Sequence, residues 1–257
     1  MLDLRTVTVM RYILPLREGG SLPALAEADD DFKYVLKFRG AGHGVKMLIS
    51  ELLGGKITEA LGLKIPELVF VNLDADFGRT EADEEIQDLL KFSEGLNLGL
   101  HYLSGSIAYD SNVKIDPLLA SKIVWLDAFI TNIDRTFKNT NLLIWHKELW
   151  VIDNGASFYF HHSWQNFDVA AKTPFKYVKD HVLLSQASLL DEADKLAHEV
   201  LNDTIFRKIV DLIPDDWLHW NDAEENPNEI REIYFQFLKN RLENSQIFVN
   251  EAKNARE

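Results

Sequence analysis

The 257-residue chain has no cysteine and is short of basic residues, and both shortages restrict its function. Without cysteine there is no disulfide bond and no thiol nucleophile, and the eight histidines show no spacing typical of a zinc site. The chain has 27 lysines and arginines and 41 acidic residues, which gives a net charge of -14. This charge disfavours generic nucleic-acid binding, which depends on basic side chains. Nothing resembles a signal peptide or an apolar run long enough for a bilayer, so we expect no membrane binding and a cytoplasmic location.

Hydrophobic residues make up 46% of the chain, enough for a substantial core, and we predict a single domain over residues 1–257. Strand patterns are expected at 6–10, 12–14, 32–39 and 68–72. Helical patterns follow Gly44 and dominate after residue 86, at 86–92, 118–130, 182–200, 203–213 and 228–253. This distribution predicts an α+β fold of two lobes: a small β-rich N-terminal lobe of about 1–73 and a larger, mainly helical C-terminal lobe of about 74–257.

The most informative segment is Asn-Ile-Asp-Arg-Thr-Phe-Lys-Asn at 132–139. Two apolar runs follow at 141–145 and 149–152, joined by a polar His-Lys-Glu in the pattern of a β-hairpin, and then comes Asp-Asn-Gly at 153–155. In kinase-fold enzymes a catalytic-loop Asp orients and deprotonates the acceptor hydroxyl, a nearby Asn holds Mg²⁺, and a second ligand comes from a separate strand end. We therefore predict Asp134 as the catalytic residue, Asn139 and Asp153 as metal ligands, and ATP and Mg²⁺ as cofactors.

A kinase also needs a lysine on an N-terminal strand, paired with a glutamate on the next helix, to hold the ATP phosphates. Lys37, near the end of the strand at 32–39, and Glu51, on the following helix, have this order. We predict both as ATP-binding residues. The glycines between them, at 40–44, match neither a Walker loop nor a dinucleotide fingerprint. A loop between strand and helix explains them, and an approach of their backbone amides to a phosphate is the alternative.

The adenine-binding hinge between the lobes is expected after the strand at 68–72. We predict it at residues 72–74, with Val71, Asn72 and Leu73 as the cofactor-binding residues of this segment. Directly afterwards, Asp76-Phe77-Gly78 spells the metal-binding tripeptide of protein kinases. It precedes the catalytic loop and lies in an acidic run, so we interpret it as a surface turn.

Three strings in this order resemble the HipA-like kinase family: YVLKFRGAGHG at 34–44, GLNLGLHYLSG at 95–105, and TNIDRTFKN at 131–139 with DNG at 153–155. The resemblance implies a bilobal protein-kinase-like fold that phosphorylates serine or threonine. It also implies Lys37 as the ATP-binding lysine, Asp134 as the catalytic aspartate, and Asn139 with Asp153 as magnesium ligands. The chain resembles a short form without the additional N-terminal subdomain of full-length HipA toxins.

Toxin members of the family phosphorylate aminoacyl-tRNA synthetases and are countered by an antitoxin. By resemblance we expect a protein substrate and an antitoxin-like partner, without carrying the target across. Ser21 is the candidate for autophosphorylation, with a plain turn as its alternative. Two other functions stay open: a small-molecule or lipid kinase on the same fold, and a non-catalytic pseudokinase scaffold. Retention of four site residues argues against a scaffold: Lys37, Asp134, Asn139 and Asp153.

Overall fold

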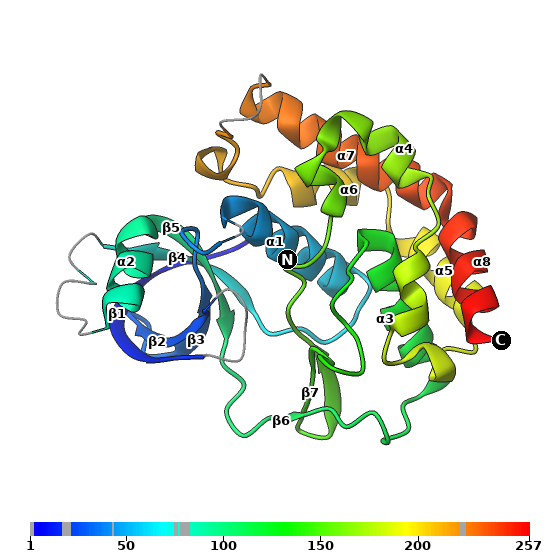
Figure 1. The fold of residues 1–257 in the computed structure, drawn as a ribbon, viewed down its shortest axis with the longest axis horizontal. Helices are drawn as coiled ribbons and strands as arrows, with labels where there is room; N and C mark the ends of the chain where they lie inside the picture. The colour runs from blue at the N-terminus through cyan, green and yellow to red at the C-terminus, as the bar shows by residue number, and fades with distance from the viewer. Residues whose placement is uncertain (1–2, 17–21, 43, 75–76, 78–82, 221–224) are drawn as a thin grey trace.

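The structure is a computed structural model that describes residues 3–16, 22–42, 44–74, 77, 83–220 and 225–257. A β-rich N-terminal part and a larger helical C-terminal part lie side by side, as the sequence predicted (Figure 1). Ser21 and two residues of the Asp76-Phe77-Gly78 motif lie outside the described residues.

The β-rich part is a closed five-stranded barrel with the strand order β1-β2-β3-β5-β4. Its strands are β1 (Thr6–Pro15), β2 (Ala24–Ala28), β3 (Lys33–Lys37), β4 (Leu68–Leu73) and β5 (Gly95–His101). Only the closing pair, β1 and β4, is parallel. Apolar side chains fill the interior, and helix α2 (Glu84–Phe92) adds Ile86 and Leu90 to this core. Closure leaves the barrel without a free edge strand.

The barrel continues past residue 73, where the sequence placed the end of the small lobe. Strand β5 pairs with both β3 and β4, so the β-rich part extends to His101. This strand escaped prediction because Gly95, Asn97 and Gly99 are residue types that disfavour strands. Asn97 is buried here and accepts a hydrogen bond from the Arg39 amide at 2.8 Å, which links β5 to the end of β3.

Helix α1 (Gly44–Ala60) lies between the barrel and the helical part (Figure 1). Its residues from Met47 to Thr58 are all buried, because the helix is covered on every side and does not have one solvated face. Gly54 permits this close packing: a Cβ added there would lie 2.7 Å from the Cβ of Asn154. The helix that carries Glu51 is therefore in direct contact with the segment after Asp153.

The predicted hairpin is present as β7 (Leu142–Trp145) and β8 (Glu148–Val151), with β6 (Ile107–Ala108) as a third strand. Helix α3 (Pro117–Ile130) precedes it and is almost wholly buried. Asp116 caps the start of α3 by accepting from the amides of Leu118 and Leu119. At its end, Thr131 takes a left-handed conformation with φ of 59°, which releases the chain into the loop that carries Asp134.

The remaining helices are α4 (Phe167–Ala171), α5 (Leu190–Val200), α6 (Asp203–Val210), α7 (Pro227–Glu243) and α8 (Ser245–Arg256). The predicted helix at 182–200 begins only at Leu190, after a 3₁₀ turn, and the predicted helix at 228–253 is two helices broken at Asn244. The break lets α7 pack on α4 and α6 while α8 packs on α3 and α5. Within the described residues, no helix is both long and apolar enough to cross a membrane.

Arg241 on α7 is fully buried and ties this packing together. Its guanidinium donates to the carbonyls of Ala128 and Phe129 near the end of α3, and to those of Ala171 and Thr173 at the end of α4. Carbonyls at helix ends lack partners within their own helix, and a cation there also suits the helix dipole. Burial lowers the pKa of Arg241 to about 9, so the side chain remains charged at neutral pH.

Replacing Arg241 should therefore destabilise the helical part. We expect Arg241→Met to lower the free energy of unfolding by about 3 kcal/mol, because buried carbonyls at two helix ends lose their donor. Arg207→Met is the matched control: Arg207 is partly exposed and pairs with Glu232 on the surface, and should change stability by less than about 1 kcal/mol. Urea denaturation followed by circular dichroism measures both, and equal losses would contradict the role assigned to Arg241.

Candidate active site

The loop after α3 brings Asp134 and Asn139 together, as the sequence predicted. The Asn139 Nδ2 group donates to Asp134 Oδ2 at 2.7 Å. Asn141 also holds Asp134, donating from Nδ2 to its backbone carbonyl at 3.1 Å and to Oδ2 at 3.3 Å. The Asp134 amide in turn donates to Asn132 Oδ1 at 3.1 Å. Two amide side chains that follow Asp134 thus hold its carboxylate, and Asn132 before it holds its backbone.

Arg135 is buried beneath this loop and uses all five of its N–H donors. Two go to the Asp127 carboxylate, at 2.6 and 3.3 Å. The others go to the carbonyls of Asn141 and Ile152 and to Asn154 Oδ1, the last two at 2.9 and 3.0 Å. One side chain therefore joins the end of α3, the Asp134 loop and the segment around Asp153.

Asp127 is the buried counter-charge of this network. Its carboxylate also accepts from Asn132 Nδ2 at 3.0 Å and contacts His181 Nε2 at 2.8 Å. Since His181 Nδ1 accepts from the Leu183 amide, we assign the ring proton to Nε2, which donates to Asp127. Burial by itself would raise the pKa of Asp127, but the Arg135 charge and the His181 contact outweigh it and keep the pKa below its ordinary value.

Lys37, Glu51 and Asp153 meet on the barrel side of the site. Lys37 Nζ lies 2.9 Å from Asp153 Oδ2 and 3.8 Å from Glu51 Oε2. The Lys37 side chain is only 6% exposed, that of Glu51 is fully buried, and that of Asp153 is 36% exposed toward the cleft. Glu51 Oε2 accepts from the Asn154 amide at 3.1 Å. The structure thus brings together three residues from β3, α1 and the end of the hairpin that the sequence assigned to one site.

Their charges are coupled. Burial alone would lower the pKa of Lys37, but the carboxylates of Asp153 and Glu51 outweigh burial and raise it. Burial likewise opposes ionisation of Asp153, yet the Lys37 charge holds the pKa of Asp153 below its ordinary value. Burial raises the pKa of Glu51, with Lys37 only partly opposing it. Lys37 and Asp153 therefore form the ion pair, and Glu51 is the more weakly ionised support behind it.

A cavity of about 770 Å³ opens between the barrel and the hairpin sheet, with Lys37, Asn139 and Asp153 in its wall. Much of the rest of the wall is apolar. It includes Val35 and Leu100 from the barrel, Leu103 from the connection between the two parts, and Leu142 and Ile152 from the hairpin region. The cavity therefore combines an apolar surface with a cluster of charged and amide side chains.

The predicted hinge residues do not reach this cavity. Val71 and Leu73 point into the barrel core, and Asn72 lies on β4, which pairs with β1 on one side and β5 on the other. The chain instead leaves the barrel after β5, and His101, Tyr102 and Leu103 line the cavity. The hinge prediction was wrong because it took β4, not the unrecognised β5, as the last strand of the barrel.

The glycine-rich turn also has a structural role. The Gly40 amide donates to Ser93 Oγ at 3.1 Å, and the Gly44 amide donates to the Ala41 carbonyl at 2.7 Å. The first bond ties the turn to the end of α2 and the second lies within the turn between β3 and α1, so both amides have structural partners, which supports the loop interpretation of these glycines.

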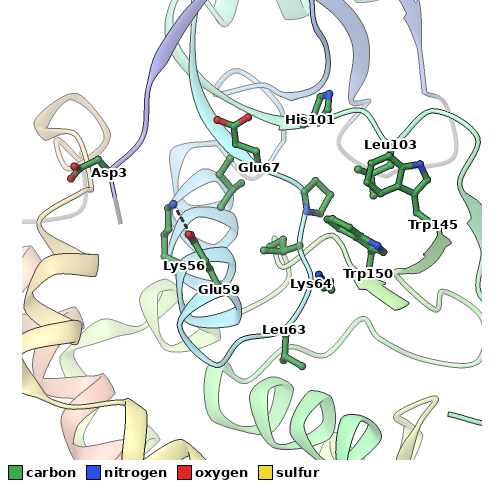
Figure 2. Close-up of a pocket in the computed structure, with 13 residues that line it drawn as sticks. Asp3, Lys56, Glu59, Leu63, Lys64, Glu67, His101, Leu103, Trp145 and Trp150 are labelled. Atoms are coloured by element: carbon green, nitrogen blue, oxygen red, sulfur yellow. Dashed lines mark hydrogen bonds and ion pairs between the residues drawn. The ribbon is translucent and has the colours of Figure 1, made fainter. Parts of the chain in front are cut away.

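A second cavity, of about 490 Å³, lies on the other side of the connection between the two parts. Figure 2 shows His101, Leu103, Trp145 and Trp150 on one side of it and Lys56, ion-paired with Glu59, on the other. His101 and Leu103 of this connection, and Pro66 before β4, line both cavities and so separate them. None of the residues assigned to the active site by sequence lines the second cavity.

A third cavity, of about 260 Å³, lies on the side of Asp134 and also contains Asp153, Ser157, His161 and His162. Asp153 therefore lines both this space and the large cavity next to Lys37. His161 is buried and its Nδ1 lies 2.9 Å from the Tyr234 hydroxyl. Burial, followed by the charges of His162 and Lys46, lowers the pKa of His161 well below its ordinary value, so its ring is neutral at pH 7.

Sequence reasoning missed Arg135, Asn141 and the wall formed by His101 to Leu103. One signal was available for the buried network: Asp127 interrupts an otherwise apolar stretch of α3, and a carboxylate in a buried helix requires a partner. The identity of that partner depends on the path of the loop, which the local sequence does not reveal.

Comparisons with known proteins identify the family and the fold of the chain. A family model described as HipA-like kinase matches residues 9–248. The crystal structure of the Helicobacter pylori proinflammatory kinase CtkA is similar over 99% of each chain, with 14% identity and a TM-score of 0.58, a likeness of fold. The Golgi casein kinase with Mn/ADP bound covers 93% of this chain and 73% of its own, at 11% identity and a TM-score of 0.45.

The comparison with curated proteins gives no match. The family match includes the barrel strands β2 to β5, the Asp134 loop and the hairpin, and it spans nearly the whole chain. The fold is protein-kinase-like, with the β-rich part as its N-terminal lobe and the helical part as its C-terminal lobe. The chain belongs to the HipA-like kinase family.

Proposed function

We propose that this kinase uses ATP and Mg²⁺ to phosphorylate a serine or threonine hydroxyl of a protein. The observation that carries the proposal is the position of Asp153. It contacts Lys37 in the large cavity and also lines the smaller cavity that contains Asp134. A phosphoryl group moving from a nucleotide in the first space to an acceptor in the second passes this carboxylate.

The large cavity fits a nucleotide. Its apolar wall suits an adenine ring, and we place the ring beside the connection at Tyr102 and Leu103, where a kinase hinge is expected. Lys37 then lies toward the phosphates. Because its ammonium group is buried and already balanced by Asp153 and Glu51, it is held in place before any ligand binds.

The donor set fits Mg²⁺ bound together with phosphates. Asp153 offers a carboxylate, and Asn139 uses its amide nitrogen on Asp134, which leaves its amide oxygen as a ligand. The described residues contain no cluster of three or more His, Asp or Glu side chains able to hold a metal alone. Mg²⁺ in phosphoryl-transfer sites commonly needs one or two protein ligands beside the phosphates, and when bound it offsets their negative charge.

Asp134 is the proposed general base. Its carboxylate accepts the proton of the acceptor hydroxyl while that oxygen forms a bond to the γ-phosphorus of ATP and the bond to the β–γ bridging oxygen breaks, releasing ADP. Asn139 and Asn141 orient the carboxylate by donating to Oδ2, which leaves Oδ1 for the hydroxyl. Both donors are neutral amides, so they set the direction of the carboxylate without forming an ion pair with it.

We call the cavity of about 260 Å³ beside Asp134 the acceptor cavity. A protein acceptor is supported by the family to which the chain belongs and by the exposed position of Tyr159 at the edge of this cavity. An antitoxin-like partner remains part of the proposal on the basis of the resemblance alone. A small-molecule acceptor would use the same base and the same nucleotide site. Incubation with cell lysate and labelled ATP separates the two, because label confined to the low-mass fraction would contradict a protein acceptor.

Asp134→Asn should slow phosphoryl transfer with little change in fold. General-base catalysis contributes about 100-fold or more, so we expect the rate of label incorporation to fall by at least about 100-fold, whereas ATP binding persists. Asp88→Asn, at an exposed position on α2 away from both cavities, is the matched control and should retain activity. The intact mass of the kinase itself, measured after incubation with Mg-ATP, gives the second readout: a gain of one phosphate is expected for the unaltered protein and not for Asp134→Asn. Equal activity of Asp134→Asn and the unaltered protein would refute the proposed role.

Lys37→Met should impair use of ATP. The buried ammonium group is placed to contact phosphates, and its loss should lower kcat/KM for ATP by about 100-fold. Lys33→Met changes the exposed lysine at the other end of the same strand and should leave kcat/KM unaltered. Initial rates at varied ATP concentration distinguish the two variants, and a Lys37→Met enzyme with the parental kcat/KM would show that the nucleotide binds elsewhere.

A further inference from the structure

A further cavity, of about 430 Å³, adjoins the acceptor cavity, with which it shares Ile133 and Tyr159. Ile133 directly precedes Asp134, so this cavity begins beside the proposed catalytic base. We call it the Arg241 pocket, after the buried arginine that forms part of its wall. Aromatic side chains make up much of the rest, and two of them are largely exposed at the rim: Tyr159 at 65% and Tyr177 at 62%. Exposed rings of this kind favour contact with another chain.

The Arg241 pocket is positively charged. Lys176 and Arg241 line it, and no Asp or Glu belongs to its described lining, although the protein carries a net charge of -14. In the described part of the chain, the hydrogen bonds of Arg241 all go to backbone carbonyls. Its charge is therefore opposed by carbonyl dipoles and not by a carboxylate. By contrast, the neighbouring acceptor cavity contains two aspartates.

Lys176 is the charged group of the pocket that a ligand can reach, because its side chain is exposed. Thr131 and Arg241 also belong to the wall, but the Thr131 hydroxyl oxygen and the Arg241 side chain are fully buried. A ligand in the pocket therefore contacts Lys176 directly and meets the charge of Arg241 only through the wall.

We propose that the Arg241 pocket binds an acidic residue of the acceptor polypeptide, together with an apolar or aromatic residue next to it. This inference rests on the proposed function and adds a preference for acidic sequence near the phosphorylated hydroxyl. The aromatic walls pack against the apolar side chain, and the carboxylate faces Lys176. Arg241, beneath the wall, adds attraction that is strengthened by the low local dielectric.

A binding measurement tests the pocket without any catalytic step. The probes are N-acetyl-Phe-Asp-amide and its uncharged counterpart N-acetyl-Phe-Asn-amide, titrated into the full chain without nucleotide and followed by NMR. We expect the acidic dipeptide to bind about tenfold more tightly, as a charged hydrogen bond allows. Lys176→Gln should remove most of this difference. Lys179→Gln, an exposed lysine on the same 3₁₀ helix that does not line the pocket, should preserve it. Equal binding of the two dipeptides, or equal effects of the two variants, would overturn the proposal.

Phosphorylation kinetics test the link to the acceptor. In a set of peptides with one serine, Asp is compared with Asn at each flanking position, and we expect Asp at one position to raise kcat/KM about tenfold in a manner that Lys176→Gln removes. Phosphate transfer that depends on Asp134 but shows no such preference would overturn this inference and leave the proposed function standing. Selective binding of the acidic dipeptide without any phosphate transfer would contradict the proposed function and, with it, the assignment of the pocket to an acceptor.

Discussion

The arrangement of the active site depends on the buried contact between Arg135 and Asp127. Removing two charges from water is unfavourable, and a buried ion pair is therefore weak evidence of stability by itself. Here the geometry explains why it is kept. Once Asp127 fixes one edge of the guanidinium, the remaining donors reach Asn141, Ile152 and Asn154. The loop with the proposed base and the segment with the proposed metal ligand are thereby held at a fixed separation, so neither can move independently of α3.

A second set of buried charges joins the two lobes at the same place. Lys37 comes from the barrel, Glu51 from α1 and Asp153 from the segment after the hairpin, and the attraction of Lys37 to the two carboxylates offsets part of the cost of burial. The close approach of α1 at Gly54 to Asn154 keeps this set in register with the Arg135 network. A phosphate entering the cleft would meet a lysine that is already charged and already oriented, so that little reorganisation is needed on binding.

Most elements with strong periodicity were predictable from sequence. Helices α2 and α3 and the hairpin of β7 and β8 agree with their predicted positions to within about two residues. The failures share one cause, which is that tertiary contacts overrode local preference. Strand β5 contains two glycines and an asparagine and is held by partners on both sides, and the helical pattern at 228–253 is broken at Asn244 because its halves pack on different neighbours.

The sequence by itself determined which residues are available for the proposed chemistry: a lysine, a glutamate, two aspartates and an asparagine in the order of a kinase, with the hairpin between the Asp134 loop and Asp153. These follow from residue type, spacing and local periodicity, which are properties of short segments. Only the tertiary structure decided which connection lines the large cavity, which side chain holds the Asp134 loop, and where a positive charge without a carboxylate partner lies close to it. Those features depend on contacts between residues far apart in the chain, as Arg241 with Ala128 and Trp217 with Leu96 illustrate, and no local pattern encodes such pairings.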